Sequence, residues 1–312
     1  MASFTIDEIG RATKGELLQK GKANYVSGVS TDTRTIQDGD VFIALKGDNF
    51  DGHHFLTTAC EKGAGAVIIS DKEAGNSLPD TVSVFLVADT KQALEDLAHF
   101  HRMRFHVPVI GVTGSKDMIT ALLSTRFHVC ATQKNFNNEI GLSMTLLSMT
   151  EKTEVTVVEM GMRGFGQIAE LCRIASPTIG VVTNVGTSHI GILGSQANIA
   201  KAKGELIEAL PADGMAILNG DDPYVKAMGN HFAGKVITYG TKEHSTVMGK
   251  DIHYEESQTR YTCAMFDEAY KIKLNLLGPH NVYDALAATA VARILGVDYR
   301  KIQKALADFQ PI

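Results

Sequence analysis

The sequence predicts an α/β protein with a small N-terminal α/β domain followed by a mostly parallel, doubly wound sheet domain. From residue 109, short apolar runs rich in β-branched residues alternate with amphipathic helical patterns. This alternation is typical of a parallel sheet covered by helices on both faces. Before residue 89 the runs are shorter and are interrupted by a polar turn at 38–40 and a glycine break at 63–65. The 312 residues, 44% of them hydrophobic, suffice for two soluble domains.

The first 88 residues predict a compact mixture of helices and strands. A helix with Ile6, Ile9, Ala12 and Leu17 on its apolar face ends near Gly15. The other predicted elements are strands on both sides of the turn at 38–40, a helix from 53, a buried strand at 66–69, a loop at 75–80 and a strand from 83.

The second domain predicts a longer run of alternating elements. A helix extends from Thr90 to about Phe105. The predicted strands are 109–112, 155–159, 179–184 and 215–219, and the predicted helices are 116–125, 141–148, 167–174 and 199–210. An antiparallel pattern over 246–276 and an alanine-rich helix over 281–296 follow, and no element is predicted after that helix.

Composition excludes several classes of protein. The formal charge of −5 indicates no broad attraction to nucleic acid. The acidic N-terminus is not a signal peptide, and no apolar run approaches the roughly 20 residues that span a bilayer. The four cysteines are far apart and form no CxxC pair, which favours a reducing, cytoplasmic compartment. We expect a monomer.

Polar side chains follow the predicted strands where ligands of this fold class bind. Glu159 ends the second strand of the larger domain, His189 lies in the loop after the third, and Lys203 lies on the next helix. Because the carboxyl ends of parallel strands meet at one edge, the carboxylate and the imidazole could share magnesium. The alternatives are a capping or salt-bridging acid, an ordinary loop histidine and a solvated lysine.

Two further clusters precede helices. Three asparagines, Asn135, Asn137 and Asn138, precede the helix from 141, and asparagine can recognise sugars and peptides through its donors and acceptor. His280 and Asn281 stand before the last helix. An asparagine-rich capped turn and a simple helix cap remain the alternatives.

The segment "VIGVTGSKDMITALLS" has the strand, glycine turn and helix of a phosphate-binding loop. Gly111, Thr113, Gly114 and Ser115 form the turn, and Met118, Ile119, Leu122 and Leu123 form the apolar face of the helix. The closing Gly-Lys-Thr, whose lysine pairs with phosphate, is absent.

Seven segments, in order, resemble the Mur ligase family over nearly the whole chain. They are "STDTRTIQDGDVFIALKGDNFDGHHF", "VIGVTGS", "NFNNEIGL", "VVEMGMRGFGQI", "TNVGTSHIG", "AKAKGEL" and "GPHNVYDALAA". Within the family, the resemblance implies the branch that adds D-alanyl-D-alanine to a UDP-N-acetylmuramoyl tripeptide in peptidoglycan synthesis, using ATP and Mg²⁺ and forming an acyl phosphate. It implies a UDP-substrate domain at 1–88, a central ATPase-like domain at 89–312, and no C-terminal ligase domain in this chain.

The resemblance also implies roles for individual residues. Glu159, His189 and Lys203 resemble catalytic and magnesium-site residues, and Lys203 matches a lysine that is carbamylated in many relatives. The residues implied to bind the nucleotide are Gly111, Thr113, Gly114, Ser115, Asn184, His280 and Asn281. Those implied to bind the UDP-linked substrate are Ser30, Thr31, Asp32, Arg34, Lys46, Asn135, Asn137 and Asn138.

The chain departs from the family pattern at three places. About six residues that join "GVTGS" to "KDMITALLS" are missing, Lys116 has the wrong spacing to replace the lost lysine, and Asp117 would repel phosphate. The helix must therefore start later or lie closer to the strand. Lys134 stands where relatives commonly have glycine, and Asp284 where they commonly have asparagine. We expect an impaired or inactive ligase, with a non-catalytic UDP-precursor-binding or regulatory module as the alternative.

Overall fold

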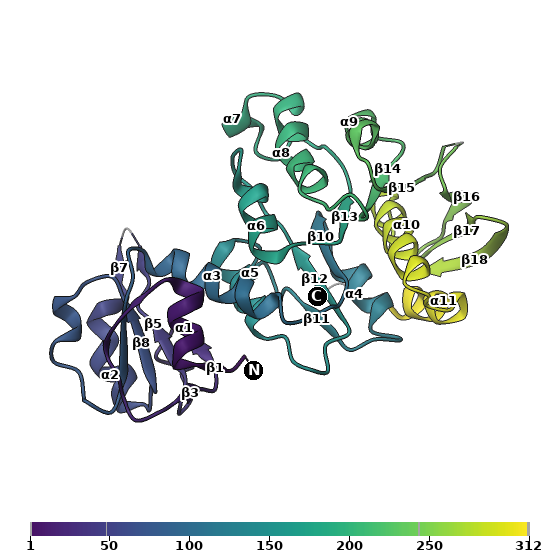
Figure 1. The fold of residues 1–312 in the computed structure, drawn as a ribbon. Helices are drawn as coiled ribbons and strands as arrows, with labels where there is room; N and C mark the ends of the chain where they lie inside the picture. Colours follow the sequence, from purple (N-terminus) through teal and green to yellow (C-terminus); the bar gives the residue numbers. More distant parts are fainter. Residues whose placement is uncertain (1, 48, 243, 311–312) are drawn as a thin grey trace. The chain divides into compact units, whose positions relative to one another are not determined.

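The computed structural model describes residues 2–47, 49–242 and 244–310, which form two compact units (Figure 1). The first unit comprises 1–106 with 139–151, and the second comprises 107–138 with 152–312. The predicted boundary at residue 88 lies before helix α3 (Thr90–Arg102), whereas the first unit continues to His106. The division of binding roles between the two predicted domains stays a prediction.

The first unit is built on a sheet with the order β2-β9-β8-β5-β4. Strands β9, β8, β5 and β4 are parallel, and the edge strand β2 is antiparallel to β9. The bounds are β2 Glu16–Gln19, β4 Val29–Ser30, β5 Val41–Ile43, β8 Ala66–Ile69 and β9 Ser83–Leu86. Two short hairpin-like pairs accompany it, β1 (Phe4–Thr5) with β3 (Tyr25–Val26) and β6 (Lys46–Gly47) with β7 (Phe50–Asp51).

Helix α1 (Ile6–Thr13) shows how local sequence sets the ends of an element. Thr5 and Glu8 form a capping box at its start, and Lys14 adopts a left-handed conformation at its end. The predicted helix face included Leu17, which is wrong, because Leu17 lies in β2 and is 40% exposed. The remaining helices of this unit are α2 (Leu56–Glu61), α3, α5 (Glu139–Leu147) and the 3₁₀ helices η1 (Gly52–Phe55) and η2 (Glu73–Gly75).

The second unit contains a sheet with the order β11-β12-β10-β13-β14-β15-β16-β17-β18. Its strands are β10 Val109–Thr113, β11 Val129–Ala131, β12 Val155–Glu159, β13 Ile179–Val182, β14 Met215–Asn219, β15 Lys235–Gly240, β16 Val247–Tyr254, β17 Thr259–Met265 and β18 Glu268–Leu274. The strands from β11 to β16 are parallel, and β17 and β18 are antiparallel additions, so the predicted fold class is confirmed. Strands β11 and β15 were not predicted.

Helices cover both faces of this sheet (Figure 1). Helices α6 and α8 pack together on one face, and α4, α10 and α11 pack together on the other. Their bounds are α4 Asp117–Leu123, α6 Gln167–Ala175, α7 Ile190–Leu193, α8 Gln196–Glu208, α9 Pro223–Met228, η3 Gly229–His231, α10 Pro279–Ile294 and α11 Tyr299–Asp308. Helix α11 corrects the expectation that nothing structured follows α10. Within the three described ranges, no helix is both long and apolar enough to cross a membrane.

Candidate functional site

The carboxyl ends of the central parallel strands bring the predicted site residues to one edge of the second unit's sheet. Strand β10 pairs with β12 on one side and with β13 on the other, so the strand order of the sheet reverses at β10. Val112 is in register with Glu159, and Thr113 with Val182. Such a reversal leaves a crevice at the strand ends, which is where ligands bind in open α/β sheets.

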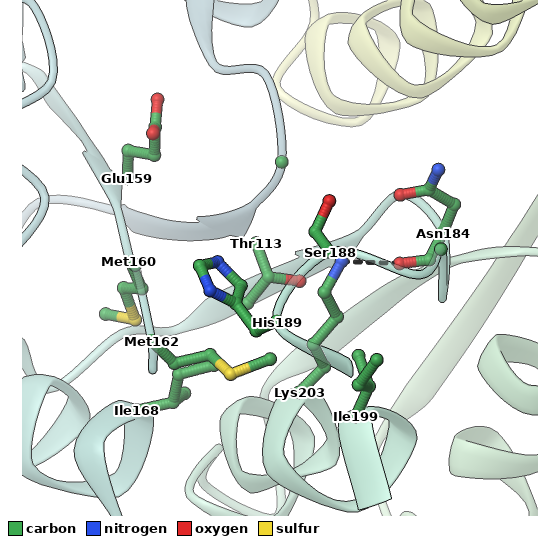
Figure 2. A pocket seen from close by; sticks show the side chains of 13 residues that line it. Thr113, Glu159, Met160, Met162, Ile168, Asn184, Ser188, His189, Ile199 and Lys203 are labelled. Atoms are coloured by element: carbon green, nitrogen blue, oxygen red, sulfur yellow. Dashed lines mark hydrogen bonds between the residues drawn. The ribbon is translucent and has the colours of Figure 1, made fainter. Parts of the chain in front are cut away.

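A cavity of about 180 Å³ at this edge is lined by all three predicted metal-site residues, Glu159, His189 and Lys203. Thr113, Gly114 and Asn184 line it as well. Figure 2 shows His189 in the middle of the view, with Glu159 and Lys203 on opposite sides of it. The structure therefore brings these residues to one cavity, as the sequence predicted.

Two of these side chains are already hydrogen-bonded. The Lys203 Nζ donates to the Asn184 carbonyl oxygen at 2.6 Å, drawn as the dashed line in Figure 2. Burial lowers the pKa of Lys203, although the Asp222 carboxylate raises it in part. The Asn137 Nδ2 donates to the Glu159 Oε1 at 2.9 Å. Both contacts hold their side chains at the wall of the cavity.

As they stand, these residues do not form a complete magnesium site. No group of three or more histidine, cysteine, aspartate or glutamate side chains among the described residues is arranged to hold a metal ion. Glu159 and His189 supply two donors, but the third group is the ammonium of Lys203, which repels a divalent cation. A carbamate on Lys203 would replace this positive charge with a negative one.

The turn between β10 and α4 does not fit a triphosphate. Only Gly114, Ser115 and Lys116 separate the strand from the helix. The Lys116 side chain is 7% exposed, and its Nζ lies 2.5 Å from the Asp117 Oδ1. This pairing occupies the lysine, and neither of the two residues lines the cavities that the described residues form at this edge. The turn thus offers no free lysine for phosphate.

The shortened turn does not delay the start of α4. Helix α4 begins at Asp117, and its four predicted apolar side chains, Met118, Ile119, Leu122 and Leu123, are all buried. Gly114, the first residue of the turn, lies against Thr183, the residue after β13. It has φ = 138°, and a Cβ atom there would lie 2.1 Å from the Thr183 Oγ1.

A second cavity, of about 450 Å³, shares Gly114 and Asn184 with the first. Its lining is Gly114, Ser115, Thr183, Asn184, Asn219, Pro279, His280, Tyr283 and Asp284. Asn281 does not line it, because its Nδ2 donates to the Leu277 carbonyl oxygen at 2.7 Å. Burial raises the pKa of Asp284 to about 6, although His280 lowers it in part.

The asparagine run lies beside Glu159. The predicted asparagines are Asn135, Asn137 and Asn138. Besides its side-chain bond to Glu159, Asn137 accepts a backbone hydrogen bond from the Gly161 amide at 2.9 Å. Lys134 has φ = 49°. This left-handed conformation favours glycine, the residue expected at this position from the resemblance to the family.

The predicted UDP-side residues belong to the first unit. Ser30, which is buried, donates its hydroxyl proton to the Asp32 carbonyl oxygen at 2.9 Å, and Thr31 lies between them. Hydrogen bonds from Arg34 lower the pKa of Asp32 to about 2, and the two side chains are 2.6 Å apart. The Arg34 side chain remains 86% exposed, so most of its donors face solvent. Lys46 lies on β6.

Two aspartates that were not among the predicted site residues accept hydrogen bonds at this edge of the sheet. The Asp222 Oδ2 accepts from the Val185 amide at 2.7 Å, and its Oδ1 caps α9. The Asp221 Oδ2 accepts from the Tyr283 hydroxyl at 2.8 Å. Both residues line a third cavity, of about 360 Å³. The sequence indicated them through two consecutive aspartates shortly after the predicted strand 215–219, at the end of a parallel strand where ligands bind.

Two family descriptions match the chain. The Mur ligase middle domain matches residues 110–292, and the Mur ligase family catalytic domain matches residues 25–102. The UDP-N-acetylmuramoyl-tripeptide–D-alanyl-D-alanine ligases of Synechocystis sp. and Bacillus subtilis are 42% and 40% identical over 90% and 95% of this chain. The chain spans 61% and 65% of their lengths. The corresponding Escherichia coli protein is 32% identical over the whole chain, which covers 69% of it.

Solved structures agree with these matches. MurF from Acinetobacter baumannii has a TM-score of 0.91 with 27% identity, over 100% of this chain and 69% of that one. MurF ligase from Thermotoga maritima, in complex with ADP, has a TM-score of 0.81 with 30% identity, over 92% of this chain and 67% of that one. The chain belongs to the Mur ligase family.

Proposed function

We propose that this chain binds a UDP-N-acetylmuramoyl peptide and a nucleoside, but does not by itself complete the ATP-dependent addition of D-alanyl-D-alanine. The names of the relatives support the substrate class, since they are D-alanyl-D-alanine ligases of UDP-linked muramoyl tripeptides. The ADP complex of the Thermotoga relative supports a nucleotide ligand for this chain. We also propose that the chain is cytoplasmic and monomeric.

The observation that carries this proposal is the three-residue turn between β10 and α4. Phosphoryl transfer depends on groups that position the phosphates and neutralise their charge. Here the only lysine in the turn is buried against Asp117. The turn therefore leaves the phosphates of ATP without a lysine that could position them and neutralise their charge.

The remaining parts of the site support binding without transfer. Asn137 is hydrogen-bonded to Glu159, which lines the first cavity. Their amide and carboxylate groups supply donors and acceptors for a muramoyl peptide. The exposed Arg34 offers planar N–H donors of the kind that bind diphosphates. The larger cavity, at about 450 Å³, falls within the usual range of about 300–1,000 Å³ for small-molecule sites.

Two measurements test the proposal. Titration calorimetry should detect binding of UDP-N-acetylmuramoyl tripeptide, and ATP with Mg²⁺ should bind no more tightly than adenosine. A phosphate-release assay with tripeptide, D-alanyl-D-alanine and ATP should stay at the level without enzyme. Release of phosphate that requires both substrates would contradict the proposal, as would tight ATP binding without precursor binding.

A further inference from the structure

Two loops beside the first cavity carry cationic side chains that have no partner. Lys134 lies in the turn between β11 and α5, and Arg163 lies in the loop between β12 and α6. Both residues are exposed, and neither side chain forms a hydrogen bond, ion pair or ring contact with another residue in the described part of the chain. The Glu159 carboxylate at this cavity is bonded to Asn137 and not to either cation. Both cations are therefore free to bind an anion.

The turn that carries Lys134 is fastened at both ends to residues that line the first cavity. The Thr132 Oγ1 accepts from the Glu159 amide at 3.0 Å, and the Asn137 carbonyl oxygen accepts from the Gly161 amide at 2.9 Å. All the residues between these two anchors are exposed. Because two residues of chain span at most about 7 Å, the backbone of Lys134 stays close to the anchor at Thr132. Its flexible side chain can therefore reach the mouth of the cavity.

Arg163 follows the same strand end. Met162, the residue before it, lines the first cavity (Figure 2). The Arg163 amide donates to the Gln167 Oε1 at 2.5 Å, which fixes the backbone of the loop and leaves the guanidinium group unbound. The backbone hydrogen bond between Gly161 and Asn137 joins this loop to the turn that carries Lys134. The two cations therefore belong to one rim of the cavity.

The backbone of Lys134 is strained. Its φ of 49° lies in the left-handed region, which is costly for a residue that has a Cβ atom. Strained residues of this kind cluster at functional sites, where the surrounding structure holds them in place. Glycine, the residue expected here from the resemblance to the family, would remove both the strain and the positive charge. A cation that persists at a strained position indicates a ligand of opposite charge.

We propose that Lys134 and Arg163 are specificity-determining residues that bind a carboxylate on the peptide arm of the precursor, besides the carboxyl group at the end of that arm. Ammonium and guanidinium groups form charge-assisted hydrogen bonds with carboxylates. Because Arg34 of the first unit is proposed for the diphosphate, these two cations are left for the peptide. Met160 and Met162 line the adjoining cavity and suit the aliphatic part of a peptide side chain. This inference rests on the proposed binding of the precursor.

Three ligands, compared by titration calorimetry, identify the carboxylate. UDP-N-acetylglucosamine has the UDP-linked sugar and no carboxylate. Two UDP-N-acetylmuramoyl tripeptides end in lysine or in 2,6-diaminopimelate, which has the same amine as lysine and one more carboxylate. Both tripeptide forms should bind the parent chain more tightly than UDP-N-acetylglucosamine. Tighter binding of the diaminopimelate form would assign the carboxylate to the third residue, and equal affinities would assign it to an inner residue of the peptide.

Substitutions at the rim test the two cations. Lys134→Gly and Arg163→Gln should each weaken binding of the tripeptide forms by about fivefold to tenfold and leave UDP-N-acetylglucosamine binding unchanged. Lys134→Arg keeps the charge and should bind like the parent chain. Lys304→Gln is the matched control, because Lys304 is exposed on α11. In urea, Lys134→Gly should be no less stable than the parent chain, since glycine relieves the left-handed backbone, so its loss of affinity cannot come from unfolding.

The inference is overturned if the substitutions of Lys134 and Arg163 leave the affinity for both tripeptide forms unchanged. It is also overturned if they weaken UDP-N-acetylglucosamine binding equally, because the cations would then act on the diphosphate, or if Lys304→Gln has the same effect. A parent chain that binds none of the three ligands would overturn the proposed function and this inference with it. That result differs from intact precursor binding that does not respond to the substitutions, which overturns this inference alone.

Discussion

The half-buried carboxyl of Asp284 should make the folded chain less stable at neutral pH than at acid pH. Its pKa of about 6 in the folded state exceeds its ordinary value of 3.8, so the folded state binds the proton more tightly than the unfolded state. Stability therefore falls as the pH rises from about 4 to about 6, and the loss persists above pH 6. Asp284→Asn removes the titrating group and should remove this loss.

The magnitude follows from the pKa difference. A difference of about two pH units corresponds to roughly 3 kcal/mol, because each unit is worth about 1.4 kcal/mol. Solvent that reaches the half-buried side chain reduces the expected gain in the free energy of unfolding to about 2–3 kcal/mol at pH 8. At pH 4.5 the gain should shrink to about 1 kcal/mol, since the unfolded state is then partly protonated too.

Urea unfolding of the parent chain and Asp284→Asn at both pH values measures the gain. The slope of the free energy against urea must be equal in the two proteins, so that the midpoints report stability alone. Asp213→Asn is the matched control, because Asp213 is exposed and the substitution should leave stability unchanged at either pH. A variant that is no more stable than the parent at pH 8, or a gain of equal size at both pH values, would show that the Asp284 carboxyl does not destabilise the folded chain through its raised pKa.

Three further substitutions test the strand-end geometry and the substrate side. Gly114→Ala should lower the free energy of unfolding by about 2–4 kcal/mol, measured in urea, because φ is 138° and the new Cβ would overlap Thr183. Asp222→Ala should cost about 1–2 kcal/mol and speed hydrogen exchange at the Val185 amide, since α9 loses its cap and that amide its acceptor. Arg34→Ala should weaken binding of the UDP-linked tripeptide by about tenfold in calorimetry while leaving adenosine binding unchanged.

Much of the fold was predictable because its central strands are buried on both faces. Strands 66–69, 155–159 and 215–219 match the structure residue for residue, since each is a continuous apolar run between turn signals. Strand β11 was not predicted because its three residues are too few to form a recognisable apolar run. Helix α11 escaped because its apolar positions are sparse, and burial of Ile302 and Leu306 becomes evident only in the fold.

The candidate site was predictable in its residues but not in their bonding. The rule that parallel strands end at one edge was enough to place Glu159 and His189 together. Lys203 donates to the Asn184 carbonyl oxygen, and Lys116 pairs with Asp117. Both contacts depend on side-chain geometry, which the spacing of residues along the sequence does not predict. The raised pKa of Asp284 could not be predicted from the sequence, because it results from burial of the carboxyl group in the folded structure.

Because its three-residue turn at 114–116 offers no free lysine, we expect the chain to bind phosphate groups weakly. Inserting Asn-Gly-Lys-Thr-Thr-Thr between Ser115 and Lys116 restores the pattern Gly-x-x-Gly-Lys-Thr from Gly114. The matched control carries alanine in place of the inserted lysine.

The most direct measurement is the ratio of ATP to adenosine affinity, by calorimetry with Mg²⁺, in the parent chain and the two insertion variants. We expect a ratio near one for the parent chain and a rise of about tenfold or more with the lysine insertion, since a charged hydrogen bond contributes about 1.5–3 kcal/mol. The alanine control should gain less than the lysine variant. A parent chain that already binds ATP at least tenfold more tightly than adenosine would show that the three-residue turn still holds the phosphates.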